Sequence, residues 1–401
     1  MIRRALLGVV RRRLRAYPAV ALVGPRQSGK TTLARALGGL YFDLEQEPER
    51  LRLDLQWGEI ESGRALAVLD EAQSWPEVFP RLRSAIDGDR RRNGRFLILG
   101  SVSPTIMAKV SESLAGRLAL VELTPFSLDE IPKVPLTRRW SLGGYPDGGV
   151  LGTRRFPQWQ RDYLTLLAQR DLPAWGLPAK PQVTLRLLRM LAAVNGQAWN
   201  ATQIGQSLGL SYHTVNSYLD YLEGAFLIRR LPPWHANVGK RLVKSPKVYW
   251  RDSGLLHSLL GGISGAALLD QPWVGASWEG FVIEQVLAHV AQRDRAGEAF
   301  FFRTSDQHEV DLVLDFGDQL WAIEIKLTAT PGTDEMRRLN KAADLIGARK
   351  RILISRTSRS IASDREVSCS LPWFLRYVLG ARSARGAGAG ARGPARAHGG
   401  P

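Results

Sequence analysis

Cysteine is almost absent from this chain of 401 residues, since Cys369 is its single example. One thiol forms neither an internal disulfide framework nor a metal site built from cysteines. Chains without disulfides are typical of a reducing compartment. The scarcity of cysteine therefore predicts a cytoplasmic protein.

Long hydrophobic runs are also missing from the sequence. No stretch reaches the roughly 18 consecutive apolar residues that a membrane-spanning helix requires. Residues 6–10 are apolar, but the Arg residues at 11–13 follow at once, so this segment is too short for the core of a signal peptide. We therefore expect no membrane partner and a cytoplasmic location.

Acidic residues are too few to balance the basic ones. The chain has 38 Asp and Glu against 55 Lys and Arg, which gives a formal net charge of +17. A basic chain favours polyanions as partners, although this argument concerns association and not fold. Nucleic acid, DNA rather than RNA, is therefore a candidate partner, while a compositional excess of Arg, Ala and Gly would explain part of the charge.

Five short apolar runs alternate with helical stretches in the first third of the chain. They occupy residues 19–23, 40–44, 65–69, 95–99 and 117–123. This alternation predicts an α/β fold in which a parallel sheet carries helices on both faces. Such sheets bind ligands at the carboxyl ends of their strands.

A complete phosphate-loop motif, G-x-x-x-x-G-K-[ST], follows the first run and opens a helix, the context that identifies a nucleotide site. Glycines let backbone N–H groups wrap around triphosphate oxygens. Lys30 would reach the β- and γ-phosphates, and the Thr31 hydroxyl would ligate Mg²⁺. ATP and Mg²⁺ are therefore the predicted cofactors. The residues assigned to the nucleotide are Gly24, Pro25, Arg26, Gln27, Ser28, Gly29, Lys30, Thr31 and Thr32.

The third apolar run leads into Asp70 and Glu71, the kind of acid pair that completes an ATPase site. We expect Asp70 to hold Mg²⁺ through water and Glu71 to polarise the attacking water. Ser101, after the fourth run, would sense the γ-phosphate, or alternatively cap a helix before Pro104. Arg117 would be an arginine finger, within the chain or on a neighbour, or alternatively a salt-bridge residue.

Ten short motifs occur in order along the chain. They are GPRQSGKTTL at residue 24, YFDL at 41, LDEAQ at 69, ILGS at 98, SLAGR at 113, LTPFS at 123, GGYP at 143, RDLP at 170, EVD at 309 and IEIK at 323. This series resembles the prokaryotic AAA-like ATP-binding proteins, in which a C-terminal domain of long-unknown function follows the ATPase. The resemblance implies ATP binding and hydrolysis. Ser28 replaces the Val or Ala that the family often has, and it is compatible because that position presents its backbone.

The chain divides into four predicted parts. Residues 1–134 form the AAA-like ATPase domain, and residues 135–240 form a helical, winged-helix-like domain. Residues 241–376 form a small nuclease-like α/β domain. Residues 377–401 are rich in Arg, Gly and Ala and are predicted to be disordered.

Residues 201–222 have the pattern of helix, turn and helix, with Gly209 in the turn and Ser211 as the N-cap of the second helix. Residues 225–230 would be the wing strand. The candidate DNA-reading side chains are Tyr212, His213, Asn216 and Asp220. This face lacks Arg and Lys and carries an acid, which is unfavourable for phosphate contact. We therefore favour a packing role over DNA reading.

An acid pattern in the last third is typical of a PD-(D/E)XK nuclease core. Asp311 lies on one predicted strand, and Glu324 and Lys326 share a face of another. The carboxylates would hold Mg²⁺ on a scissile phosphate, and the lysine would orient water. A helix would add Glu279, with Glu284 as the second choice. The alternatives are ordinary charge alternation on a strand and a nuclease-like scaffold that has lost cleavage.

Together these patterns predict an ATP-binding protein that hydrolyses ATP with Mg²⁺ and whose nuclease-like domain contacts nucleic acid. One alternative is a nucleotide-switched interaction module with slow turnover. Another is a DNA-binding regulator without nuclease activity, which the neutral-to-acidic face of the winged segment disfavours. A protein partner and the oligomeric state stay open.

Overall fold

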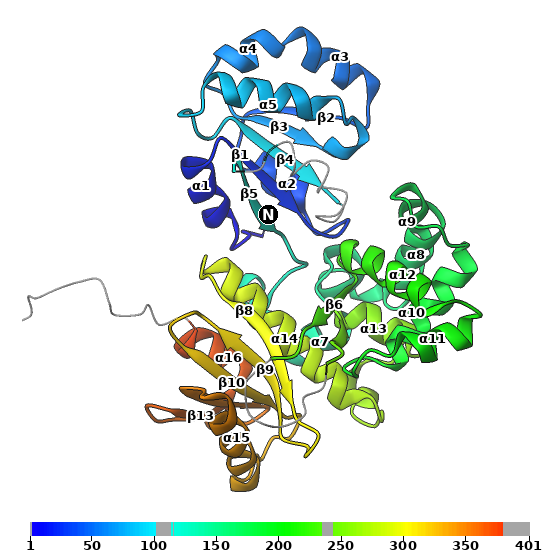
Figure 1. Cartoon of the computed structure of the whole chain (residues 1–401), viewed down its shortest axis with the longest axis vertical. Helices are drawn as coiled ribbons and strands as arrows, with labels where there is room; N and C mark the ends of the chain where they lie inside the picture. Colours follow the sequence, from blue (N-terminus) through cyan, green and yellow to red (C-terminus); the bar gives the residue numbers. More distant parts are fainter. Residues whose placement is uncertain (1, 102–113, 115, 235–243, 380–401) are drawn as a thin grey trace, which may run out of the picture.

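The computed structural model of the chain describes residues 2–101, 114, 116–234 and 244–379. They form an N-terminal layered sheet, a helical part and a C-terminal mixed sheet (Figure 1). The predicted disordered tail lies outside the described residues from residue 380 onward, and its first residues belong to η7 (Phe374–Val378). None of the helices in the described ranges is long and apolar enough to cross a bilayer.

The N-terminal sheet has five parallel strands in the order β2-β3-β4-β1-β5. The strands are β1 (Ala19–Val23), β2 (Leu40–Asp43), β3 (Ala67–Asp70), β4 (Phe96–Gly100) and β5 (Leu118–Glu122). Every residue of β1 is buried, because a central parallel strand is covered on both faces and needs a continuous apolar run. The predicted α/β class is therefore confirmed.

Helices cover both faces of this sheet. Val20 and Leu22 pack with the first two helices, whereas Ala21 and Val23 pack with the next three. The helices are α1 (Leu7–Ala16), α2 (Lys30–Arg35), α3 (Glu47–Leu55), α4 (Trp57–Ser62) and α5 (Val78–Gly88). Since only β4 separates β1 from β3, the loop after β1 and the acids at the end of β3 emerge at the same edge.

The middle part of the chain is largely helical. Its helices are α7 (Leu136–Leu142), η3 (Pro146–Val150), η4 (Thr153–Arg155), α8 (Gln158–Leu166), η5 (Leu167–Asp171), α9 (Leu172–Ala174), α10 (Pro181–Ala193), α11 (Ala201–Leu208), α12 (Tyr212–Gly224) and α13 (Ser253–Leu259). The predicted turn is confirmed, because Gly209 has φ 68° after α11 and the Ser211 side chain accepts the Thr214 N–H at 3.1 Å.

The expected wing strand is shifted and has a distant partner. It is β6 (Ile228–Leu231), which pairs antiparallel with β7 (Lys247–Trp250). This ribbon lies between the helical part and the C-terminal sheet, because Pro233 bridges to Phe301 in the first strand of that sheet. The winged-helix assignment stays a prediction.

The C-terminal sheet has six strands in the order β12-β13-β11-β10-β9-β8. They are β8 (Glu298–Arg303), β9 (Glu309–Asp315), β10 (Leu320–Ile325), β11 (Lys350–Ser355), β12 (Ile361–Ala362) and β13 (Glu366–Ser370). Two long helices, α14 (Val274–Gln292) and α15 (Thr333–Ile346), pack in separate apolar cores against it. Strand β13 and the short helix α16 (Leu371–Trp373) were not predicted.

Candidate functional site

The loop between β1 and α2 has a backbone that requires glycine at two positions. Gly24 has φ 151°, and a Cβ added there would lie 2.2 Å from the Leu123 carbonyl oxygen. Gly29 has φ 95° and directly precedes α2, and Gln27 also has a positive φ of 60°. Left-handed residues of this kind let successive N–H groups converge on an anion. The loop therefore has the backbone that a phosphate site needs.

Lys30 is buried at the base of this loop. Its ammonium donates to the carbonyl oxygens of Gly24 at 2.9 Å and Pro25 at 3.0 Å. Burial lowers the pKa of Lys30 to about 8, although Glu71 and Asp70 oppose that shift. The ammonium is thus held by the loop itself, within reach of any phosphate bound there.

The Thr31 hydroxyl donates to Asp70 Oδ2 at 2.7 Å, which joins the phosphate loop to the end of β3. Tyr41, on the neighbouring strand β2, donates its hydroxyl to the same oxygen at 2.6 Å. The Glu71 N–H donates to Asp70 Oδ1 at 3.0 Å. Asp70 is therefore fixed by three donors. The sequence analysis did not predict the hydrogen bond of Tyr41 to Asp70. The position of Tyr41 in the YFDL motif could have indicated a role at this site.

Glu71 follows β3 in a left-handed conformation with φ 48°. Ser101, just after β4, donates its hydroxyl to Glu71 Oε1 at 2.9 Å. The Gln73 amide donates to the other carboxylate oxygen. The structure thus brings the predicted base and the predicted sensor together, whereas the helix cap suggested before Pro104 lies outside the described residues.

Arg117 lies away from the phosphate loop. The prediction that it is an arginine finger acting within the chain is therefore wrong. Its guanidinium donates to both carboxylate oxygens of Asp87, at 2.8 and 3.0 Å. Its carbonyl accepts the N–H of Ala19, the first residue of β1. Arg117 therefore lies at the amino end of the sheet, opposite the loop, and the salt-bridge alternative holds. Action on a neighbouring chain stays a prediction.

Arg26, in the phosphate loop, contacts the helical part. Its guanidinium lies 2.9 Å from Asp171 at the end of η5 and 3.6 Å from Glu45. The Tyr163 hydroxyl donates to the Arg26 carbonyl at 3.4 Å. Burial raises the pKa of Asp171, and Arg26 opposes that shift. The contact was missed, although RDLP was among the motifs.

Arg4 supports the loop from the N-terminal side. Its guanidinium donates to the carbonyl oxygens of Ser28 at 2.5 Å and Thr124 at 2.6 Å, and to Glu130 at 2.8 Å. The side chains of Arg4 and Glu130 are only 7% and 1% exposed. Arg4 lies outside the sequence motifs, so this internal role was not predicted.

The C-terminal acids gather around a lysine that the sequence did not single out. The Lys247 ammonium lies 3.0 Å from Glu279, 2.7 Å from Glu309 and 3.9 Å from Asp311. Tyr249 also donates its hydroxyl to Glu279. Burial alone would lower the pKa of Lys247, but the three carboxylates raise it. These residues are called the Lys247 cluster below.

Glu324 and Lys326 form a pair beside this cluster, with 2.5 Å between carboxylate and ammonium. Asp311 Oδ2 accepts the Ile325 N–H at 2.8 Å, while the buried Glu324 Oε2 has no hydrogen-bond donor among the described residues. Burial raises the pKa of Asp311, and Glu279 and Glu324 raise it further. Burial also raises the pKa of Glu324, against the effect of Lys326.

The structure thus brings the predicted C-terminal metal ligands near one another, but lysine ammonium groups pair with them. Lys247 lies beside Glu279 and Asp311, and Lys326 lies beside Glu324. Among the described residues, there is no group of three or more His, Cys, Asp or Glu side chains arranged to hold a metal ion. A metal role for Glu279, Asp311 and Glu324 stays a prediction. The second choice, Glu284, is placed elsewhere, because both its oxygens pair with Arg229 and one also pairs with Arg251.

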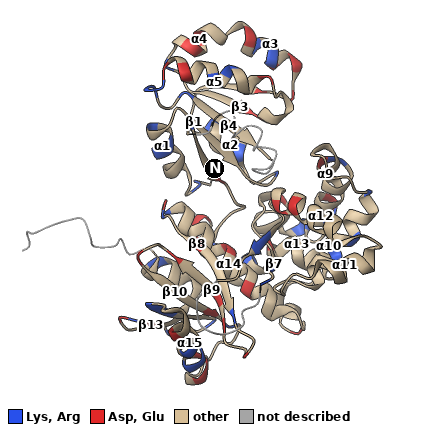
Figure 2. Cartoon of the chain, in the orientation of Figure 1, with Lys and Arg blue, Asp and Glu red and all other residues tan. Residues whose placement is uncertain are grey.

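Two of the four candidate DNA-reading residues of α12 make internal contacts, whereas Tyr212 and His213 are exposed. Asn216 accepts the Trp199 indole N–H at 2.7 Å, and Asp220 pairs with Arg230 at 2.8 Å. Lys and Arg are spread over all three parts of the chain (Figure 2). The preference for a packing role over DNA reading stays a prediction.

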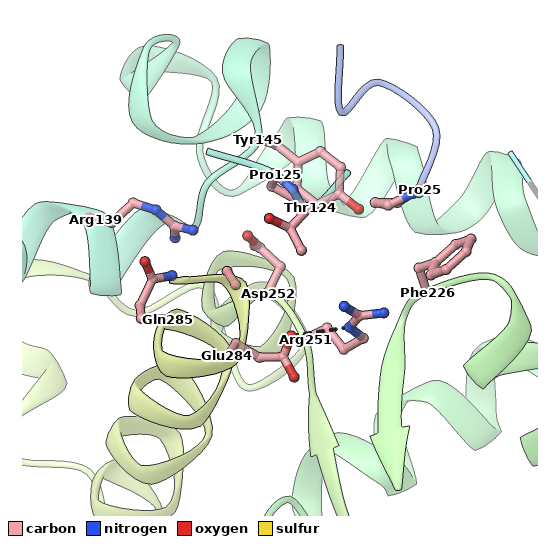
Figure 3. Close-up of a pocket in the computed structure, with 11 residues that line it drawn as sticks. Pro25, Thr124, Pro125, Arg139, Tyr145, Phe226, Arg251, Asp252, Glu284 and Gln285 are labelled. Carbon is pink, nitrogen blue, oxygen red and sulfur yellow. Dashed lines mark hydrogen bonds and ion pairs between the residues drawn. The ribbon is translucent and has the colours of Figure 1, made fainter. Parts of the chain in front are cut away.

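A small cavity lies where the three parts of the chain meet (Figure 3). Pro25 from the phosphate loop, Tyr145 from the helical part and Glu284 from α14 line it. Arg251 enters from the end of β7 and pairs with Glu284 at 3.1 Å and with Glu122 at the end of β5. The phosphate loop therefore borders a cavity that residues of both other parts also line.

Three protein-family models match successive parts of the chain. Residues 16–132 match an AAA domain. Residues 135–264 match a domain of unknown function (DUF8612), and residues 274–374 match another domain of unknown function (DUF4143).

Curated relatives and solved structures are similar to this chain over much of its length. Uncharacterized proteins of Mycobacterium tuberculosis (Rv2008c) and Mycobacterium bovis (Mb2031c) are each 38% identical over 371 residues, which is 91% of this chain and 83% of the relative. A Walker-type ATPase of Pyrococcus abyssi is 16% identical, with 65% of this chain and 96% of that one covered, at a TM-score of 0.47. A STAND protein of Pyrococcus horikoshii is 13% identical, with 72% and 46% covered, at a TM-score of 0.24.

Proposed function

This chain belongs to the AAA-like ATP-binding protein family, and from that premise we propose that it hydrolyses ATP with Mg²⁺ at the loop that runs from Gly24 to Thr31. One observation carries the proposal, the 2.7 Å hydrogen bond from the Thr31 hydroxyl to Asp70. It joins a hydroxyl of the phosphate loop to a carboxylate of β3, and oxygen donors of these two kinds suit Mg²⁺. Bound with ATP, Mg²⁺ would neutralise charge on the phosphate oxygens.

The residues around this pair have separate tasks in the proposed reaction. Lys30 would exchange the carbonyl oxygens of Gly24 and Pro25 for the β- and γ-phosphates. Glu71 would accept a hydrogen bond from the attacking water and orient it. Ser101 donates to Glu71, so it would hold that carboxylate in position.

The decisive experiment measures phosphate release from ATP by the full chain, with and without DNA or RNA. We expect Glu71→Gln to lower the rate by about 10²- to 10⁴-fold while ATP binding persists. Glu59→Gln, on the exposed face of α4, is the matched control and should keep the full rate. Phosphate release that is unchanged in Lys30→Ala would refute the proposal.

A second candidate, a nucleotide-switched interaction module, is favoured by the contact of Arg26 with Asp171. A loop residue tied to the helical part would transmit nucleotide binding to that part, whether or not turnover is fast. Limited proteolysis in ATP and in ADP tests this candidate. Different cleavage patterns together with negligible phosphate release would favour it over hydrolysis, and identical patterns would count against it.

Nucleic acid is the partner that the net charge of +17 favours. We propose contact without cutting, because Lys247 already pairs with Glu279 at 3.0 Å and Glu309 at 2.7 Å. DNA affinity should fall steeply as salt rises to physiological strength. Binding that ignores salt, or cutting of DNA in Mg²⁺, would contradict this part of the proposal.

A further inference from the structure

The Lys247 ammonium holds together carboxylates from two elements of the C-terminal part. Glu279 belongs to α14, whereas Glu309 and Asp311 belong to β9. The ammonium lies 3.0, 2.7 and 3.9 Å from their respective oxygens. The Lys247 side chain is 6% exposed, whereas that of Lys326 is 39% exposed. Lys247 is therefore the cation enclosed within the cluster.

The backbone of Lys247 is held in place on both sides. It pairs with Leu231 in β6 and forms a bridge with Ala198. The adjacent Pro246 carbonyl accepts the Trp199 N–H at 2.8 Å. The ammonium lies 5.6 Å from the ring centre of Phe301, which is fully buried. The lysine thus reaches the acids from a fixed strand and along an apolar wall.

A divalent cation would have to compete with this ammonium for the same oxygens. Mg²⁺ binds oxygen ligands at about 2.1 Å in near-octahedral geometry, whereas Glu279 Oε1 already accepts from Lys247 and from Tyr249. Two cations beside the same carboxylates repel each other. In the described part of the chain no side chains form a three-ligand metal group, so the acids do not fit a metal while Lys247 is in place.

We propose that the Lys247 ammonium is the resident cation of this cluster and stands where a divalent metal would otherwise lie between Glu279 and Asp311. The nuclease-like acids then serve as an ionic link between β7 and the C-terminal sheet. Metal-dependent cleavage is not a reaction of this cluster. The proposal is independent of ATP hydrolysis, since it concerns the chain without nucleotide.

The first test titrates MnCl₂ into the nucleotide-free full chain by calorimetry and compares it with Asp311→Asn. We expect the two proteins to bind Mn²⁺ alike, so that no site depends on Asp311. A saturable Mn²⁺ site that is present in the natural chain and absent in Asp311→Asn would overturn the proposal.

The second test removes the ammonium with Lys247→Met and uses Lys341→Met, an exposed lysine of α15, as the matched control. Lys247→Met should have a lower Tm and regain about 2–4 °C or more in Mn²⁺, whereas the control should behave as the natural chain. A folded Lys247→Met that gains no Mn²⁺ affinity would overturn the proposal. If Lys247→Met does not fold, the Mn²⁺ titration of the natural chain and of Asp311→Asn tests the proposal on its own.

Discussion

Lys30 is a buried ammonium whose pKa burial lowers to about 8 from the ordinary 10.5. A phosphate at the loop would favour the charged form, because opposite charges stabilise each other. Between pH 8 and 10.5 Lys30 of the free protein is therefore increasingly neutral, and ATP binding takes up a fraction of a proton that grows with pH. In the same window the unfolded chain binds more protons than the folded chain, so this group makes the folded state more stable as pH rises.

We accordingly predict that ATP affinity falls as pH rises above about 8, by up to tenfold per pH unit. Calorimetry at pH 9 in buffers of different ionisation enthalpy should detect an uptake approaching one proton. Lys30→Arg keeps its charge and is the control, since it should show no uptake. Equal uptake in both proteins would assign the proton to another group.

His257 supplies a second prediction at this scale. Its Nδ1 lies 2.8 Å from the Ser141 carbonyl, and its Nε2 lies 2.6 Å from the Ser277 hydroxyl. That hydroxyl also accepts the Trp140 indole N–H, so it has its own proton to donate to a neutral imidazole. Burial lowers the pKa of His257 to about 4.

Because the unfolded chain gains a proton near pH 6.5 and the folded chain only near 4, stability should fall as pH falls through this window. The loss should reach about 3 kcal/mol below pH 4. Urea unfolding at pH 7 and at pH 4.5 measures this slope. His257→Gln should flatten the slope, and exposed His213→Gln should not.

Several site residues were predictable because their chemistry lies in contiguous motifs, and others were not. Thr31 and Asp70 belong to motifs whose tasks follow from phosphate and Mg²⁺ chemistry, and they do meet, at 2.7 Å. Arg4 and Lys247 belong to no such motif. Arg4 meets Glu130, which is 126 positions away. Contacts of that separation arise from the packing of whole elements, which single-chain patterns do not specify.

Elements buried on both sides were the most predictable parts of the fold. The apolar runs for β1 and β3 are long enough and sharply bounded, and the observed strands differ from them by at most two residues. The ribbon of β6 and β7 was predicted only in part. Its first strand had a pattern, but its partner begins 16 positions after β6 ends, and nothing local indicates that pairing.

The contact of the phosphate loop with η5 leads to a third prediction. Arg26 and Asp171 have side chains that are 27% and 8% exposed, so their pair is partly screened. Asp171→Asn should lower the free energy of unfolding by about 1–2 kcal/mol and should loosen the helical part from the loop. Chemical denaturation and hydrogen exchange at η5 measure these effects. Asp334→Asn, in an exposed pair on α15, should change stability little.

At the scale of the whole molecule, Arg251 joins the N-terminal sheet to the C-terminal part. It pairs with Glu122 at the end of β5, and its side chain is 10% exposed. It also pairs with Glu284 on α14 (Figure 3). Glu284 also pairs with Arg229. These charges lie at the junction of the three parts. Loss of Arg251 would leave Glu122 without this partner and the buried Glu284 with Arg229 alone.

Arg251→Met is therefore predicted to destabilise the chain by about 3 kcal/mol and to separate its unfolding into more than one transition. Differential scanning calorimetry and limited proteolysis between β5 and α14 would measure this. Arg189→Met, at an exposed position of α10, is the matched control. A single cooperative transition with unchanged midpoint in Arg251→Met would show that other contacts hold the parts together.

The buried guanidinium of Arg4 has a practical consequence for dissecting this protein. The AAA match begins at residue 16, so an expression fragment cut at that boundary would lack the donor that Ser28 and Thr124 rely on. Glu130, whose side chain is 1% exposed, would lose its ion pair with Arg4. If such a fragment failed to bind nucleotide, the cause would be the loss of the Arg4 hydrogen bonds. The result would not show that the phosphate loop of the full chain cannot bind nucleotide.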